Sequence, residues 1–307
     1  MKQVDILLAT YNGSLYIDEF LNSIVNQTYQ SWRLIIRDDC SSDDTLEKVI
    51  KFSRNYPNNV KLIIGERRLG IVKNFSELML SSSSEYIFFA DQDDVWLPNK
   101  IEITMSLAEK TENFDARAIL IHSDLTVVDK DLNVIAKSFW RYQRLNPARG
   151  YSLRDLMIQN IVTGCTMMIN RKLLEISLPL PDSARMHDWW LALVACATGN
   201  IYYIPQQTVW YRQHGKNDIG AKKYSAISLL ARIKNIQKIK ASIFLTQAQC
   251  CDIYVRYFFK LNKSDALAVL GFCLLQDYGV LARRFLAASL GYRKHGLYRT
   301  IAFYFFM

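Results

Sequence analysis

The first hundred residues alternate short apolar runs with segments whose apolar residues recur every three or four positions. The runs have the length of buried strands, and the segments between them have the periodicity of helices that cover a sheet. Ser14 is the expected N-cap of the first helix, and Asp43 and Asp44 place acidic charge where the second helix begins. Repeated strand–helix units predict an α/β protein with a mostly parallel sheet covered on both faces. Strands are expected at 4–9, 34–36, 60–64 and 86–90, and helices at 16–25, 43–50 and 71–80.

Beyond residue 115 the alternation loosens and then gives way to a helical pattern. Strands are predicted at 119–121, 165–169, 201–204 and 209–211, and a helix at 188–198. From residue 224 onward the pattern is almost entirely helical. A membrane-spanning helix needs about 20 apolar residues. The apolar run at 266–275 ends at Gln276, so we expect no transmembrane segment.

Basic charge is concentrated in the C-terminal part of the chain. From residue 222 to the end there are 14 Lys and Arg against 3 acidic residues, although the whole chain carries only +9. Such asymmetry is typical of proteins that bind nucleic acid or an anionic membrane. No nucleic-acid-binding motif accompanies it, so we expect no nucleic acid partner and favour the membrane surface.

Residues 229–240 mix basic and large apolar side chains, a composition that suits a helix lying on anionic lipid. Tyr254, Tyr257, Phe258 and Phe259 add aromatic residues typical of membrane interfaces. The alternative is a helical bundle that folds against the rest of the chain and leaves a solvated basic face. The two interpretations are compatible with each other.

The cysteines and the N-terminus both indicate a reducing compartment. The six cysteines show neither Cys-x-x-Cys pairs nor zinc-type spacing, which predicts free thiols. The N-terminal apolar run is short and leads directly into the Asn12–Gly13 turn, unlike a secretory signal. We therefore expect a cytoplasmic protein.

Three polar clusters follow predicted strands directly, at residues 10–12, 38–39 and 91–94. Parallel sheets bind ligands at the carboxyl ends of their strands, so these clusters should meet at one site. Asp91, Asp93 and Asp94 would repel one another there, and a divalent cation such as Mg²⁺ or Mn²⁺ would relieve the repulsion. The cation's remaining positions suit a diphosphate. The alternative is a solvated acidic turn that caps a helix beginning near Pro98.

Five motifs in succession resemble those of family 2 glycosyltransferases, which have the GT-A fold. They are ATYNG at 9–13, DDCSSDDT at 38–45, DQDDVWLP at 91–98, HDWW at 187–190 and YRQH at 211–214. The resemblance covers about residues 3–217. The DQDDVW and HDWW sequences are most similar to those of rhamnosyltransferases in bacterial O-antigen and capsule synthesis. The resemblance implies a GT-A catalytic domain over 1–217, followed by a basic amphipathic helical segment over 218–307.

The resemblance implies a role for residues around the nucleotide. Asp39 would accept a hydrogen bond from the imide N–H of uracil or thymine, and Asp91 would lie near the ribose. Cys40 stands where the family usually has glycine, so the geometry of this loop is expected to differ slightly from that of the family. The implied nucleotide-sugar contacts are Thr10, Tyr11, Asn12, Asp39, Asp91 and Arg212.

The resemblance also implies metal ligands. Asp93, Asp91 and His214 would hold Mn²⁺ or Mg²⁺, with Asp94 in support. His214 alternatively touches the diphosphate, and Arg212 offsets its charge. Asp38 is interpreted as a loop cap, and Arg67 and Arg68 as solvated surface residues.

Asp188 is the candidate catalytic base. Inverting transfer needs a carboxylate that removes the proton of the acceptor hydroxyl, and apolar surroundings would raise its pKa usefully. The alternative is that Asp188 only caps a helix and that the tryptophans beside it belong to the core. The residues expected on the acceptor side are Trp189, Trp190, Thr163 and Gly164.

Taken together, these features predict an inverting, metal-dependent glycosyltransferase on the inner face of the cell membrane. The leading donor is dTDP-rhamnose, and the expected acceptor is a saccharide linked to a polyprenyl diphosphate. UDP-galactose or a UDP-N-acetylhexosamine is the alternative donor. A nucleotidyltransferase would carry a basic glycine-rich loop that ATYNG lacks. The carboxylates of Asp39, Asp91, Asp93 and Asp188 argue against a non-catalytic membrane-surface scaffold.

Overall fold

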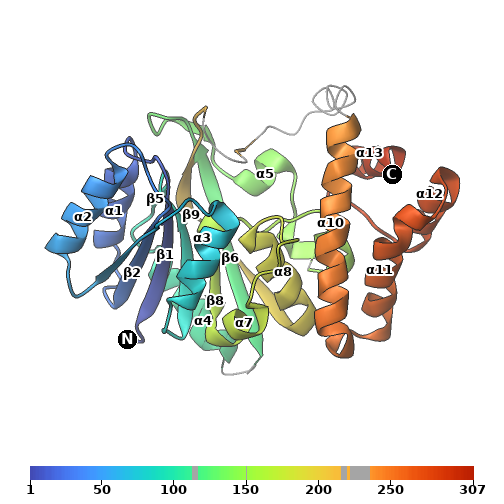
Figure 1. Ribbon diagram of the computed structural model, residues 1–307, viewed down its shortest axis with the longest axis horizontal. Helices are drawn as coiled ribbons and strands as arrows, with labels where there is room; N and C mark the ends of the chain where they lie inside the picture. The colour runs from blue at the N-terminus through green and yellow to red at the C-terminus, as the bar shows by residue number, and fades with distance from the viewer. Residues whose placement is uncertain (113–116, 150, 216–219, 222–235) are drawn as a thin grey trace.

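Nine strands of the described chain form one mixed sheet, with helices on both faces (Figure 1). The computed structural model describes residues 1–112, 117–149, 151–215, 220–221 and 236–307. The strand order is β3-β2-β1-β4-β8-β6-β9-β5, and β7 pairs with β6. The strands are β1 (Val4–Thr10), β2 (Trp32–Asp38), β3 (Val60–Ile64), β4 (Tyr86–Asp91), β5 (Val95–Trp96), β6 (Ala118–Val128), β7 (Val134–Ala136), β8 (Met168–Asn170) and β9 (Gly199–Arg212).

The four predicted N-terminal strands are confirmed, and all run parallel. Side chains of β1 alternate between two cores: Leu7 packs into one cluster, and Ile6 and Leu8 into the other. A strand buried on both faces must be apolar throughout, which explains the unbroken run in the sequence. The helices between these strands are α1 (Ile17–Val25), α2 (Thr45–Asn55) and α3 (Ile71–Leu80).

The predicted N-cap of the first helix is wrong. Helix α1 begins at Ile17, and its N-cap Tyr16 makes no capping hydrogen bond through its side chain. The Gly13 carbonyl accepts hydrogen bonds from the backbone N–H groups of Tyr16 and Ile17. A turn therefore separates Ser14 from the helix, and the Ser14 N–H instead donates to Asp43.

The second half of the sheet contains antiparallel pairs. Strand β8 is antiparallel to both β4 and β6. The strand predicted at 165–169 begins as a 3₁₀ turn at Gly164–Thr166, and only its end forms β8. The helices of this half are α4 (Lys100–Glu112), α5 (Phe139–Gln143), α6 (Leu153–Ile158), α7 (Arg171–Ser177) and α8 (His187–Thr198).

The two short strands predicted at 201–204 and 209–211 are one strand, β9. Pro205 interrupts the apolar pattern and suggests a break. The pairing with β6 shifts register there: Ser123 lies opposite Ile204, whereas Asp124 lies opposite Gln207. A proline is tolerated at such a bulge because its missing N–H leaves no ladder bond unmade.

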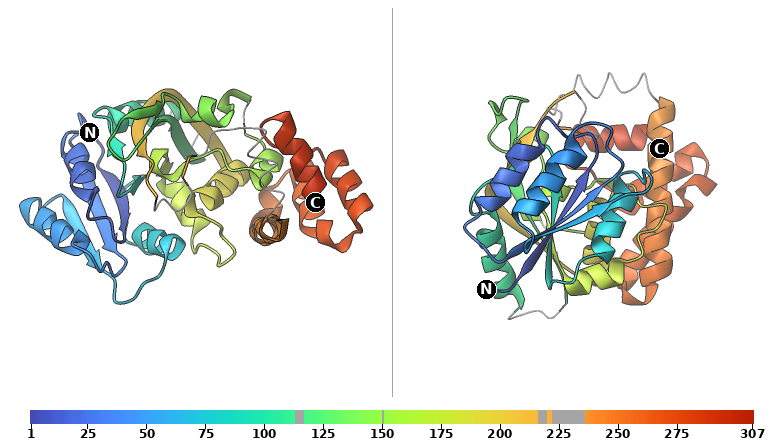
Figure 2. Two further views of the ribbon diagram at one scale, coloured as in Figure 1. Left: turned by 90° about the horizontal axis from the view of Figure 1, so that it is seen from above. Right: turned by 60° about the vertical axis from the view of Figure 1, so that its left-hand side comes forward.

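The C-terminal helices form a layer beside the α/β body (Figures 1 and 2). They are α10 (Ile236–Tyr257), α11 (Lys263–Cys273), α12 (Val280–Ser289) and α13 (Leu297–Phe306). Cys250, Ile253 and Phe272 belong to the same buried cluster as Leu191 of α8. The predicted bundle folded against the rest of the chain is therefore confirmed for residues 236–307.

Part of the C-terminal prediction lies outside the described residues. This applies to residues 229–235 of the predicted amphipathic helix and to the predicted boundary at 217. Among the described helices, none combines the length and the apolar character that crossing a bilayer requires.

Candidate active site

The three polar clusters predicted from the sequence meet at the carboxyl ends of β1, β2 and β4. The Thr10 hydroxyl donates to Asp38 at 3.0 Å, which joins the first two loops. Asp38 also accepts from the Ser41 N–H, as a loop cap does. The Tyr11 N–H donates to Gln92 at 2.9 Å, which joins the first loop to the third.

Gln92 is a site residue that sequence reasoning missed. Its amide also donates to the Tyr11 carbonyl at 2.8 Å, so both backbone groups of Tyr11 are fixed. A Cβ atom on Gly13 would lie 2.2 Å from the Gln92 amide carbon. The loop therefore approaches this closely only because residue 13 is glycine. The only signal in the sequence is its position between Asp91 and Asp93 in the polar cluster after the fourth predicted strand.

Asp39 is buried at the wall of the site and holds a neighbouring loop. Arg37 donates to it at 2.9 Å, and the backbone N–H groups of Leu69 and Gly70 donate at 2.8 Å each. A carboxylate has about four lone-pair sites, so these three bonds leave one acceptor direction. Cys40, which follows, has φ +63°, a left-handed conformation that suits the family's usual glycine.

Arg68 is exposed, as predicted, and it also borders the site. Its guanidinium carbon is 4.0 Å from the centre of the Tyr11 ring. Both residues line the central cavity. The contact with Tyr11 was not predicted, because a stacking partner 57 positions earlier in the chain cannot be recognised from the local sequence.

The predicted metal ligands face one cavity. Asp91, Asp93 and His214 all line it, and the His214 Nε2 lies 2.7 Å from a carboxylate oxygen of Asp93. Tyr16 stacks on the His214 ring with centroids 4.9 Å apart, which fixes the imidazole. Two carboxylates and an imidazole form a donor set that suits Mg²⁺ or Mn²⁺.

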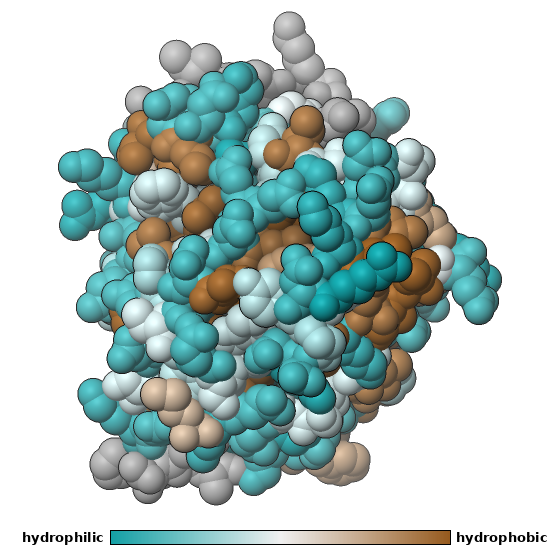
Figure 3. Space-filling view, turned by 90° about the vertical axis from the view of Figure 1, so that its left-hand side faces the viewer, coloured by the Kyte–Doolittle hydropathy of each residue, from teal (hydrophilic) through white to brown (hydrophobic). Residues whose placement is uncertain are grey.

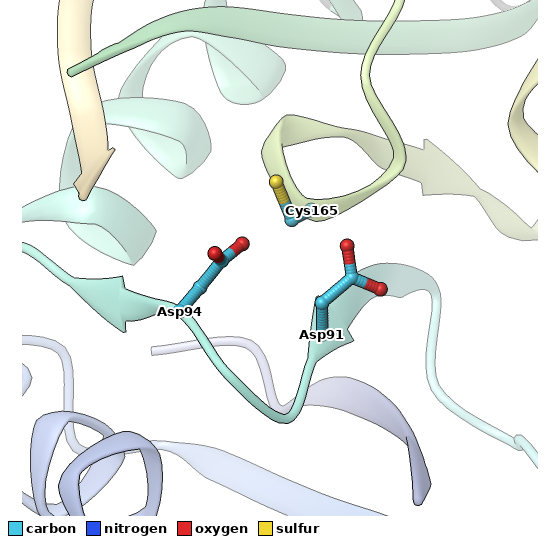
Figure 4. Close-up of side chains that lie close together, drawn as sticks. All are labelled: Asp91, Asp94 and Cys165. Carbon is cyan, nitrogen blue, oxygen red and sulfur yellow. The ribbon is translucent and has the colours of Figure 1, made fainter. Parts of the chain in front are cut away.

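Asp94 is fully buried, and Figure 4 shows it close to Asp91 and Cys165. Burial, together with Asp93 and Asp91, raises the pKa of Asp94 well above its ordinary value. Ligand atoms of Asp91, Asp94 and Cys165 lie within 4.8 Å of one another. Burial, together with the carboxylates of Asp94 and Asp91, raises the pKa of the Cys165 thiol. The thiol is therefore protonated and is a poor ligand for a hard cation. The donor set that suits the cation is thus the one facing the cavity.

Arg212 does not line the cavity, which corrects the prediction that it contacts the diphosphate. Its side chain is 1% exposed and donates to the carbonyls of Asp93 and Lys130 and to the Glu19 carboxylate. The guanidinium also lies 4.6 Å from the Tyr16 ring centre. These contacts engage all three guanidinium nitrogens inside the protein, so Arg212 positions the loop that carries Asp93.

Asp188 lies in the first turn of α8 and lines the same cavity. Its carboxylate accepts from the N–H groups of Trp189 at 2.6 Å and of Gly164 at 3.2 Å. Burial raises the pKa of Asp188 to about 6, and these hydrogen bonds, with one from Asn160, limit the rise. The group is therefore mostly ionised at neutral pH and still basic enough to take a proton.

Gly164 allows the approach to Asp188. A Cβ atom on Gly164 would lie 3.0 Å from His187 Nε2 and 3.6 Å from the Asp188 Cβ. His187 cannot withdraw easily, because its ring stacks on Phe75 at 3.8 Å between centroids and also on Phe89. The sequence predicts Gly164 near the acceptor. In the structure, Gly164 lines the cavity beside the candidate base.

The two tryptophans after Asp188 have different surroundings. Trp189 lines the cavity, and its indole N–H donates to the Leu156 carbonyl. Trp190 is 0% exposed, and its indole N–H donates to the Ser177 carbonyl within the core. Trp190 therefore cannot contact an acceptor, and for this residue the alternative of a core tryptophan holds. Thr163 also lines the cavity.

The cavity measures about 1640 Å³. A site for one drug-sized ligand typically measures 300–1,000 Å³. The volume is thus sufficient for two substrates, one at the strand ends and one beyond Asp188. The mixed sheet with flanking helices and a large cavity at the strand ends, lined by Asp91, Asp93 and Asp188, is the arrangement of a GT-A glycosyltransferase.

Comparison with known proteins identifies the family. The profile described as Glycosyl transferase family 2 matches residues 5–176, more than half of the chain. The chain belongs to this family. Its relatives include a dTDP-rhamnosyl transferase, RfbG of Shigella flexneri, which is 29% identical over 246 residues, or 76% of this chain and 79% of that protein.

A second relative and two solved structures extend the comparison. The UDP-Glc:alpha-D-GlcNAc-diphosphoundecaprenol beta-1,3-glucosyltransferase WfgD of Escherichia coli is 28% identical over 200 residues, 64% of this chain and 71% of that protein. Staphylococcus aureus TarS 1–349 in complex with UDP-GlcNAc has a TM-score of 0.57 at 16% identity, covering 94% and 88% of the two chains. The mannosyltransferase PcManGT of Pyrobaculum calidifontis, in complex with GDP-Man and Mn²⁺, has a TM-score of 0.53 at 16% identity, covering 94% and 74%. The GT-A fold and a glycosyltransferase activity in polysaccharide synthesis follow.

Proposed function

We propose that this enzyme transfers a sugar with inversion from a dTDP- or UDP-linked donor to a lipid-linked saccharide in O-antigen or capsule synthesis. The leading donor is dTDP-L-rhamnose, as the 29% identical relative uses a dTDP-linked rhamnosyl donor by name. The observation that carries the proposal is the buried Asp188, with a pKa of about 6, on the wall of the cavity that Asp91 and Asp93 also line.

The nucleotide lies against the loops after β1 and β2 in this proposal. Tyr11 presents its ring to the base, and the remaining acceptor direction of Asp39 takes the imide N–H of uracil or thymine. Thr10 and Asn12 complete this wall. Guanine presents two adjacent donors, N1–H and the exocyclic amine, whereas Asp39 has one acceptor direction left, so a pyrimidine nucleotide is favoured.

Asp91 and Asp93, with His214, would hold a divalent cation. When bound, Mn²⁺ or Mg²⁺ offsets the negative charge of the departing diphosphate. The chain's own part is to keep these donors in place: Tyr16 packs against the imidazole of His214, and Arg212 anchors the Asp93 carbonyl.

The transfer itself uses Asp188 as the general base. The carboxylate takes the proton of the acceptor hydroxyl while that oxygen bonds to the anomeric carbon. The bond from this carbon to the diphosphate oxygen breaks in the same step, and the nucleoside diphosphate leaves. A single displacement inverts the anomeric configuration. Trp189 offers an aromatic face to the acceptor sugar.

The enzyme is proposed to act at the inner face of the cell membrane. Of the 21 large apolar side chains that the described chain exposes, 15 lie at residues 244–305, and this part of the chain is also basic. An exposed apolar surface with basic neighbours suits an anionic bilayer. The opposite end of the molecule, around α1 and α2, is mainly hydrophilic (Figure 3). The named substrate of one relative is a diphosphoundecaprenol-linked sugar, which resides in a membrane.

Two alternatives remain distinct from this proposal. UDP-galactose or a UDP-N-acetylhexosamine would fit the same pyrimidine site, and one structural neighbour binds UDP-GlcNAc. A non-catalytic membrane-surface scaffold would not need Asp188 held at a raised pKa beside a two-compartment cavity.

The test is transfer with purified protein, lipid-linked acceptors extracted from bacterial membranes, and dTDP-rhamnose, UDP-galactose or UDP-GlcNAc in separate reactions. The expected result is metal-dependent release of dTDP from dTDP-rhamnose and a product of inverted configuration. Release of UDP from either other donor would replace the donor assignment. A product of retained configuration would contradict the role of Asp188.

A further inference from the structure

The part of the cavity beyond Asp188 has a composition of its own. We call this part the far arm; its walls come from α5, the segment at 158–163, α10, α11 and α13. Among the described residues that line it are three cations, Arg185, Lys294 and Arg299, and one carboxylate, Asp188. Its apolar walls are Leu145, Ile158, Ile161, Val162, Ile243, Phe272 and Phe303.

The three cations are held in defined positions. Arg299 donates to the carbonyl and side-chain oxygens of Gln143, at 2.7 and 2.9 Å. The Lys294 ammonium lies 5.5 Å from the centre of the Phe303 ring. Arg185 donates to Ser242 on α10 at 2.7 Å and is only partly exposed. All three side chains are only partly exposed, so an anionic ligand in the far arm would meet positive charge that water screens incompletely.

Helix α13 lies between the far arm and an exposed apolar surface. Arg299 and Phe303 are four residues apart and share the face that lines the far arm. Leu297, Ile301 and Phe305 lie on the other side of the helix and are 72%, 54% and 59% exposed. One helix therefore presents a cation to the cavity and an apolar stripe to the outside.

We propose that the far arm binds the diphosphate of an acceptor whose other end is a long apolar chain, with Lys294 and Arg299 contacting the phosphates. This inference rests on the proposed function, since it assigns the far arm to the acceptor. Two cations match a group with two or more negative charges. The apolar chain continues from the arm along the exposed stripe of α13, and the attached sugars extend in the opposite direction, toward Asp188.

The test uses farnesyl diphosphate as a soluble probe and calorimetry as the measurement. Saturating UDP with Mg²⁺ is present throughout, so that the probe's diphosphate does not compete for the donor site. Wild type is expected to bind farnesyl diphosphate and to bind farnesol at least tenfold more weakly. Lys294→Gln and Arg299→Gln are each expected to weaken farnesyl diphosphate binding roughly tenfold, about 1.4 kcal/mol.

Arg293→Gln is the matched control. It removes the same charge from an exposed neighbour that does not line the cavity, so farnesyl diphosphate binding should be unchanged. Because Arg299 also holds Gln143, its variant is checked by thermal unfolding, and the decision rests on Lys294→Gln, whose partly exposed side chain is less costly to replace.

The outcomes separate this inference from the proposed function. Equal binding by Lys294→Gln and Arg293→Gln, or equal binding of farnesol and its diphosphate, would overturn the far-arm assignment. So would a Lys294→Gln variant that loses affinity only for phosphatidylglycerol vesicles, because the cation would then serve a lipid headgroup. UDP affinity, measured in the same samples, reports on the donor site: its absence in wild type rejects the proposed function instead.

Discussion

At the scale of the residue, burial and hydrogen bonding act in opposite directions on Asp188. Burial raises the pKa of the carboxyl group, and the hydrogen bonds from the N–H groups of Trp189 and Gly164 limit the rise. A carboxylate balanced in this way is ionised at neutral pH, yet its negative charge is poorly solvated. Both properties favour removal of a hydroxyl proton, and each leads to a prediction.

Replacing Asp188 by Asn should remove the base and leave the donor site intact. We expect turnover to fall roughly 10²–10⁴-fold, with unchanged UDP affinity in the presence of Mn²⁺. In wild type, turnover should rise with pH through a midpoint near 6, where the carboxyl group loses its proton. Initial rates measured from pH 5 to 8 test this. Turnover in Asp188→Asn equal to wild type would remove Asp188 from the mechanism.

The same residue should affect stability. The folded-state pKa of Asp188 is raised from 3.8 to about 6, so protonation favours the folded state. This contribution is fully present below about pH 4 and is lost as the pH rises through 6. The unfolding free energy of wild type should therefore fall relative to Asp188→Asn by up to about 3 kcal/mol between pH 4 and 7. Urea unfolding at both pH values measures it; a constant difference would mean that the pKa is not raised.

At the scale of the element, the sequence predicts where loops meet better than it predicts what holds them. The polar clusters after β1, β2 and β4 were predictable because parallel strands end at one edge of a sheet. The brace formed by Gln92 and the single strand running through Pro205 were not, because both depend on partners far along the chain.

The HDWW motif shows the same limit on a helix. Adjacent helical residues point about 100° apart, so Trp189 and Trp190 have different surroundings although they are neighbours in the sequence. Nothing in the local sequence indicates which of the two is buried. The choice follows from the packing of α8 against α7, where Trp190 reaches the Ser177 carbonyl.

Arg212 provides an element-scale prediction, because it ties β9 to α1 and to the loops around Asp93 and Lys130. Arg212→Met keeps much of the buried volume but leaves two carbonyl oxygens without their donor. We expect a loss of about 2–4 kcal/mol in unfolding free energy and weaker metal-dependent UDP binding. Denaturant unfolding and calorimetry test this. Weaker UDP binding with unchanged stability would instead support the direct phosphate contact predicted from the sequence.

At the scale of the whole molecule, one cavity connects the α/β body to the C-terminal helices. Phe272, Lys294, Arg299 and Phe303 line it together with the loops of β1 and β4. The helices thus line the candidate site as well as contributing to the core. The concentration of basic residues in the C-terminal segment was visible in the sequence. Its contribution to the cavity was not predictable, because that depends on how the helices pack against the α/β body.

The exposed apolar residues of α12 lead to a prediction about membranes. Phe285 and Leu281 are 75% and 80% exposed. Burial of a phenylalanine contributes about 1.5–3 kcal/mol, so Phe285→Glu should weaken binding to phosphatidylglycerol vesicles tenfold or more. Val134→Glu, on the exposed β7, is the control with the same change of charge. Sedimentation with vesicles measures both. Equal binding by the two variants, or no binding by wild type, would contradict a membrane-facing α12.

The central claim is that the strand ends of the sheet form a metal-dependent site for a pyrimidine nucleotide-sugar. The most direct measurement is calorimetric titration of dTDP, UDP and GDP, each with and without Mn²⁺, into wild type and Asp93→Ala. We expect wild type to bind dTDP or UDP tightly only with Mn²⁺, GDP to bind much more weakly, and Asp93→Ala to lose the metal-dependent binding. If folded wild type bound none of the three, or bound them equally with and without metal, the account of this site would be wrong.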